Sequence, residues 1–82
     1  MLLNDKLRTI KMRIMSNCII ENEINIVYFM NENNLHIYND LVRLDIIDKV
    51  SLTNFNKLLS LIKNDYELKK FNNKIKSIEI YN

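Results

Sequence analysis

The chain has 82 residues, 48% of them hydrophobic and 27% charged, and its formal net charge is +2. This length and composition predict one small globular domain, residues 1–82, whose limited core makes it marginally stable alone. The chain contains no Gly, Pro or Ala, which excludes the glycine-rich phosphate loops of nucleotide-binding proteins.

The first predicted element is a strand at residues 9–15. Ile10, Met12 and Ile14 alternate with polar residues, and a period of two is typical of a half-buried strand. We therefore expect the N-terminal part of the chain to belong to a sheet.

Two further strands are predicted at residues 23–30 and 35–38. In the first of these, Val27 and Phe29 make the second face apolar as well, so we expect this strand at the centre of the sheet. The Asn-rich segment 31–34 between them predicts a turn, because Asn tolerates the left-handed backbone conformation that Gly usually supplies. The three strands are expected to form an antiparallel meander.

Residues 41–50 fit two structures. Val42, Leu44 and Ile46 alternate with charged residues as they would in a strand. Asp40, just before them, is equally suited to cap the start of a helix. The frequency of Val and Ile favours the strand, and both alternatives stay open.

The last third of the chain predicts two helices and a short final strand. Ser51 or Thr53 offers an N-cap for the first helix, and the second begins at Asp65. The final strand is predicted at residues 78–81, where Ile78 and Ile80 alternate with Glu79 and Tyr81. Apolar residues recur at helical spacing along the first helix: Phe55, Leu58, Leu59 and Ile62. The predicted fold is α+β, a small antiparallel sheet of three to five strands covered on one face by two C-terminal helices.

Few side chains suit catalysis. A nucleophile pair would need the single Cys18 and the single His36 within about 3 Å of each other, and nothing in their spacing demands that. Cys18 stands among apolar residues, which is typical of a buried structural cysteine. Asp40, Asp45 and Asp48 lack the Gly-containing loop of common calcium sites. We therefore predict no enzymatic activity, no metal and no cofactor.

The sequence also predicts a location. It has no uncharged apolar run of about 18 residues, the length that a membrane-spanning helix needs. Residues 1–5 lack the basic and apolar regions of a signal peptide. One cysteine cannot form an internal disulfide, which suits a reducing compartment. We expect a cytoplasmic protein without a membrane partner.

The charges predict a protein-binding surface. The middle of the chain is acidic, whereas both ends are basic. We expect the central hairpin to present acidic residues to a basic surface on a partner, with aromatic residues as apolar anchors. The acidic residues are Glu21, Glu23 and Glu32, and the anchors are Tyr28, Phe29 and Tyr38.

The composition suggests a biological setting for such a surface. The absence of Gly, Pro and Ala, together with abundant Asn, Ile and Lys, indicates an AT-rich coding sequence. Small reading frames of this kind are typical of phages and mobile elements, which often encode stoichiometric inhibitors such as anti-CRISPR proteins. The first hypothesis is therefore an inhibitor that occludes the basic surface of a host or defence protein, itself a candidate nucleic-acid-binding protein. A homodimer is a further expected partner.

The alternative hypothesis is a small nucleic-acid-binding regulator. On a continuous helix Lys63, Lys70 and Lys74 would fall on roughly one side and could face phosphates. Two consecutive helices could also mimic a helix-turn-helix. However, this segment contains no Arg, the residue that most often reads bases.

Overall fold

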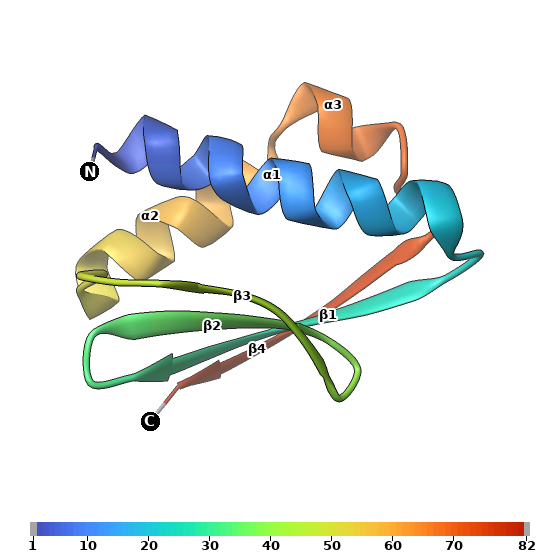
Figure 1. The fold of residues 1–82 in the computed structure, drawn as a ribbon. Coiled ribbons are helices and arrows are strands. Elements are labelled where there is room, and N and C mark those ends of the chain that lie inside the picture. Colours follow the sequence, from blue (N-terminus) through green and yellow to red (C-terminus); the bar gives the residue numbers. More distant parts are fainter. Residues whose placement is uncertain (1, 82) are drawn as a thin grey trace.

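The computed structural model of the chain describes residues 2–81, apart from the side chains of residues 79 and 81. Three helices lie on one side of a four-stranded sheet, and the opposite side of the sheet is left open (Figure 1). The elements in chain order are α1 (Leu3–Ile20), β1 (Ile24–Asn31), β2 (Asn34–Asn39), β3 (Val42–Ile47), α2 (Leu52–Lys63), α3 (Tyr66–Lys69) and β4 (Ile75–Tyr81).

The sheet is mixed, with the strand order β3-β2-β1-β4. Strands β1, β2 and β3 form an antiparallel meander, and β4 pairs parallel to β1. A parallel neighbour needs a crossover connection, which α2 and α3 supply between β3 and β4. Strands β3 and β4 are therefore the two edges. The strand alternative for residues 41–50 is the correct one.

The prediction of a strand at residues 9–15 is wrong, because this segment lies inside the 18-residue helix α1. Its buried residues, Lys6, Ile10, Ile14 and Cys18, stand four apart, the spacing of one face of a helix. Met12, which the alternation placed beside Ile10, is 64% exposed. The predicted antiparallel sheet covered by two C-terminal helices is therefore wrong as well. The longest covering helix comes first in the chain, and the sheet is mixed.

The second predicted helix, expected to begin at Asp65, has only four residues, Tyr66–Lys69. Asp65 caps α3 by accepting a hydrogen bond from the Leu68 backbone N–H over 3.0 Å. Partial burial raises the pKa of Asp65, but hydrogen bonds from Lys11 and from that N–H outweigh burial and hold it below its ordinary value. The helix ends at Lys69, tight turns follow, and β4 already begins at Ile75.

The core lies between the sheet and the helices. β1 alternates strictly, and its buried side chains meet those of α1 and α2. The rings of Tyr28 and Phe55 contact edge to face at 6.5 Å, a favourable aromatic geometry. Within residues 2–81, no helix is both long enough and apolar enough to cross a membrane.

Residues other than Gly supply the left-handed backbone positions. Asn33 has φ 63°, as the Asn-rich segment predicted, but Glu32, Asp40 and Lys49 also have φ between 50° and 58°. Asn31 pairs with Asn34, so Glu32 and Asn33 form the two-residue turn of the β1–β2 hairpin. Positive φ at both central residues is the requirement of a type I′ turn, which favours Asn and Gly.

We expect Glu32→Gly to stabilise the fold by about 0.5–1 kcal/mol, because Gly adopts positive φ without the steric cost that a Cβ atom imposes. Glu32→Ala removes the same charge but keeps the Cβ atom, so it should bring no gain. Urea unfolding of both variants separates the two causes. An equal gain in both would assign the effect to the charge and contradict the backbone explanation.

Candidate functional site

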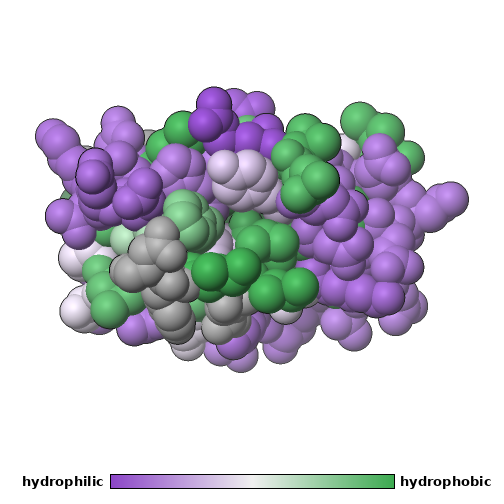
Figure 2. Space-filling view, turned by 90° about the horizontal axis from the view of Figure 1, so that it is seen from below, coloured by the Kyte–Doolittle hydropathy of each residue, from purple (hydrophilic) through white to green (hydrophobic). Residues whose placement is uncertain are grey.

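The side of the sheet away from the helices carries an uncovered group of apolar and aromatic side chains. The alternation of β1 directs Val27 and Phe29 to this side. The strand register places Val27 between Tyr38 and Ile78, and it places Phe29 between His36 and Ile80. Figure 2, seen from the open side, shows apolar residues gathered in the middle of a largely hydrophilic surface. We call this group the open-face patch: Val27, Phe29, His36, Tyr38, Ile46, Ile78 and Ile80.

Three rings hold one another in place within the patch. His36 contacts Phe29 edge to face, with 5.7 Å between ring centroids. It also stacks on Tyr38, with centroids 6.5 Å apart and ring planes inclined by 15°. Because each ring is packed against another ring, across β1 and β2 for Phe29 and His36 and along β2 for His36 and Tyr38, the patch loses little side-chain entropy when a partner covers it.

A shallow hollow of ≈ 310 Å³ lies at one end of the patch. Leu41, in the β2–β3 turn, is 95% exposed and stands at its rim. The Asp40 carboxylate, also at the rim, accepts a hydrogen bond from the Asn25 side-chain amide over 3.0 Å. The lining residues are Val27, Phe29, Tyr38, Asp40, Leu41 and Ile80. An apolar side chain fits such a hollow, and the carboxylate favours a cation beside it.

The three predicted acidic residues do not form one surface. Glu21 and Glu23 precede β1, whereas Glu32 follows it, and the eight residues of β1 span roughly 26 Å. Lys76 also pairs with Glu23 at 2.8 Å. The hairpin register brings another acidic residue, Asp40, to the end of β1 where Glu21 and Glu23 lie.

The three predicted anchors lie on two different sides of the sheet. Phe29 and Tyr38 belong to the open-face patch. Tyr28 is fully buried against the helices and is not accessible to a partner. Sequence reasoning missed Ile78 and Ile80, although their alternation was visible, because nothing local showed that this strand would pair with β1.

The three predicted lysines do not share one helix. Lys63 ends α2, whereas Lys70 lies just after α3, where its ammonium stands 5.5 Å from the centroid of the Tyr66 ring. Lys74 precedes β4, and its Nζ donates to the Cys18 carbonyl oxygen over 2.8 Å. This bond satisfies a carbonyl at the C-terminal end of α1, so Lys74 has a structural role.

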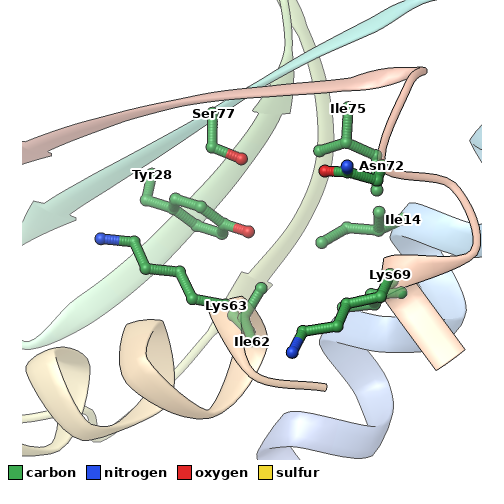
Figure 3. A pocket seen from close by; sticks show the side chains of 9 residues that line it. Ile14, Tyr28, Ile62, Lys63, Lys69, Asn72, Ile75 and Ser77 are labelled. Atoms are coloured by element: carbon green, nitrogen blue, oxygen red, sulfur yellow. The ribbon is translucent and has the colours of Figure 1, made fainter. Parts of the chain in front are cut away.

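A second hollow lies on the helix side of β4. Figure 3 shows Ile75 and Ser77 of β4 above Ile62 and Lys63 of α2, with Lys69 of α3 beside them. Its volume is ≈ 190 Å³, whereas pockets for small molecules are typically about 300–1,000 Å³. This hollow is therefore a poor candidate for a ligand site.

The groups considered for catalysis lie on different sides of the sheet. Cys18 is buried in α1, and this burial raises the pKa of its thiol, although the nearby Lys74 ammonium opposes the shift. A thiol with a raised pKa is a poor nucleophile. His36 lies on the open side of the sheet. Among the described residues, no three His, Cys, Asp or Glu side chains lie close enough together to hold a metal ion.

Comparisons of the chain with models of protein families, with curated protein sequences and with solved structures find no match. The open-face patch, with its rings and its hollow, is the strongest candidate site.

Proposed function

We propose that the chain is a non-enzymatic protein-binding module that uses the open-face patch as its contact surface. The observation that carries this proposal is the cluster of apolar and aromatic side chains on neighbouring strands that no helix covers. Aromatic-rich apolar surfaces of this kind mark sites of protein contact. An apolar sheet face in water would otherwise lower solubility without stabilising the fold.

The hollow defines the chemistry of the partner. The partner segment presents an aliphatic or aromatic side chain to the floor formed by Val27 and Phe29. A lysine or arginine beside that side chain faces Asp40, and Glu21 adds negative charge at the same end of the sheet. The basic surface expected from the sequence is retained, but it meets the β2–β3 turn and the open face instead of three glutamates along one hairpin.

The proposed action is occlusion: the bound chain covers a functional surface of its partner. The setting is that of an inhibitor encoded by a phage or mobile element and directed at a host or defence protein. The small size and the AT-rich composition support this setting. The nucleic-acid-binding alternative is less well supported, because the three lysines do not form a stripe and Lys74 is held by a helix carbonyl.

The test compares two exposed leucines in a capture assay with nuclease-treated bacterial lysate. Leu41→Ala removes a side chain from the hollow, whereas Leu52→Ala truncates a leucine that is 54% exposed at the start of α2. We expect Leu41→Ala to weaken capture of the partner about tenfold or more, as at an interface hot spot. Leu52→Ala should leave capture unchanged.

A second arm tests the cation. Asp40→Asn removes the rim charge but keeps a side chain that tolerates positive φ, so it should weaken capture most at low salt, where electrostatic attraction is strongest. Equal capture by the Leu41 and Leu52 variants would contradict the open-face patch as the contact surface. Partners lost on nuclease treatment would point to the nucleic-acid regulator.

A further inference from the structure

Among residues 2–81, strand β4 pairs with a neighbouring strand on one side only, where it lies beside β1. The Ile24 N–H donates to the Lys74 carbonyl oxygen over 2.8 Å, and the parallel register continues from there. In a parallel ladder the backbone groups of alternate residues point to the same neighbour. The backbone N–H and C=O groups of the even-numbered residues of β4 therefore point toward β1. Those of Ser77 and residue 79 point the opposite way, out from the edge of the sheet.

The other edge strand, β3, is protected against pairing. Its register with β2 shifts at residues 37 and 38, which marks a bulge. The Asp45 carboxylate accepts a hydrogen bond from the next residue's N–H, and Arg43 adds a second charge. Bulges and charged side chains are devices that prevent edge-to-edge association. The register of β4 with β1 is continuous and shows no shift, so the β4 edge has no bulge to hinder pairing.

We propose that the β4 edge pairs antiparallel with the β4 edge of a second copy of this chain, which joins the two sheets into one of eight strands. A twofold axis beside Ile78 pairs Ser77 of each chain with residue 79 of the other. This register forms about four backbone hydrogen bonds, since each of the two pairs of Ser77 with residue 79 exchanges two N–H···O=C bonds. It also brings the two Ile78 side chains together on the open side.

The second copy is favoured as the occupant because β4 is complementary to itself. In this register the outward-facing N–H and C=O groups of Ser77 and residue 79 each meet a group of the opposite kind. Ile78 is 57% exposed in the single chain, and pairing covers it with the partner's Ile78 in the closely spaced type of antiparallel pair. The two open-face patches then become continuous. An 82-residue chain with a small core also gains stability from the association.

The contact is small, so the dimer is expected to be weak and dependent on concentration. Strand pairing alone buries less than the roughly 1,200 Å² of a standard stable interface. Sedimentation velocity between about 10 µM and 1 mM, concentrations suited to interfaces of this size, should show a shift from monomer to dimer. A monomer throughout that range would overturn the proposal.

The first variant removes an edge donor. Ser77→Pro eliminates the outward N–H but no ladder bond to β1, and Pro is tolerated on edge strands where its nitrogen faces solvent. We expect the dimer to weaken at least about tenfold, a loss consistent with unmade backbone bonds, while circular dichroism shows the fold retained. A dimer of unchanged strength would exclude the β4 edge.

The second test does not depend on proline being tolerated. Ile78→Lys and Ile78→Glu each place like charges opposite one another across the twofold axis, so each chain alone should be monomeric. The two variants mixed should form a dimer again. Val42→Lys is the matched control, because Val42 is 66% exposed on the other edge strand, and it should leave the dimer unchanged. Failure of the mixed pair to associate would overturn the register.

The edge pairing and the proposed partner surface share Ile78 of the open-face patch, so a variant outside β4 is needed to separate them. Leu41 lies in the β2–β3 turn and shares its hollow with Ile80, but it supplies no backbone group to the β4 edge, so Leu41→Ala should leave the dimer intact. Conversely, loss of capture by Leu41→Ala with a persistent monomer would support the protein-binding proposal and reject the dimer.

Discussion

Replacing Ile10 by Ala is expected to lower the free energy of unfolding by about 2–5 kcal/mol, the usual cost of a large buried side chain. Met12→Ala, two residues further, should change it by no more than about 0.5 kcal/mol. Ile10 is fully buried against the core, whereas Met12 is 64% exposed. In a strand the two side chains would share one face and their losses would be similar.

Urea unfolding of the two variants measures this difference directly, with the slope m as a check that the unfolding transition is unchanged. Ile14→Ala provides a second buried position on the same helical face and should resemble Ile10→Ala. Similar losses for Ile10→Ala and Met12→Ala would contradict α1 and favour the strand that the alternation alone suggests.

Local patterns predicted several elements because their causes are local. Ser51 caps α2 through its own side chain, which accepts a hydrogen bond from the Asn54 N–H. The strand alternation of β1 and the turn after it are also properties of neighbouring residues. The strand prediction for residues 9–15 is wrong because apolar residues at positions 10 and 14 fit both the two-residue period of a strand and the 3.6-residue period of a helix. Lys6 and Cys18, which lie outside residues 9–15, continue the four-residue spacing of buried positions and so indicate the helix.

The candidate site could be predicted only in part, because it depends on contacts between distant residues. Val27 and Phe29 indicated a strand with two apolar sides. The side that stays open is set by the helices, which all lie on the other one (Figure 1). The parallel pairing of β4 with β1 brings Ile78 beside Val27, and no local signal reports that register. Glu32 lies apart from Glu21 and Glu23 because the whole of β1 stands between them.

The second large effect is expected at Lys6, a charged residue that is only 4% exposed. Its Nζ donates to the carbonyl oxygens of Lys49 at 2.8 Å and Asp48 at 3.3 Å. These carbonyls belong to the connection between β3 and α2, where Lys49 has φ 58°. The ammonium therefore ties the first turn of α1 to a left-handed backbone position that a Gly-free chain must hold without Gly.

Lys6→Met keeps an unbranched apolar chain of four heavy atoms in place of the lysine stem, and it removes the ammonium and both of its hydrogen bonds. Burying a lysine costs free energy that methionine avoids, but the two carbonyl oxygens then lose a charged donor, and hydrogen bonds to charged groups contribute about 1.5–3 kcal/mol each. We expect the lost hydrogen bonds to outweigh the avoided cost of burying a lysine, with a net decrease of about 2 kcal/mol in the free energy of unfolding. Lys57→Met, at an exposed position of α2, is the matched control and should stay within about 0.5 kcal/mol of the parent chain. Equal unfolding midpoints for the two variants would show that the ammonium of Lys6 does not hold the β3–α2 connection.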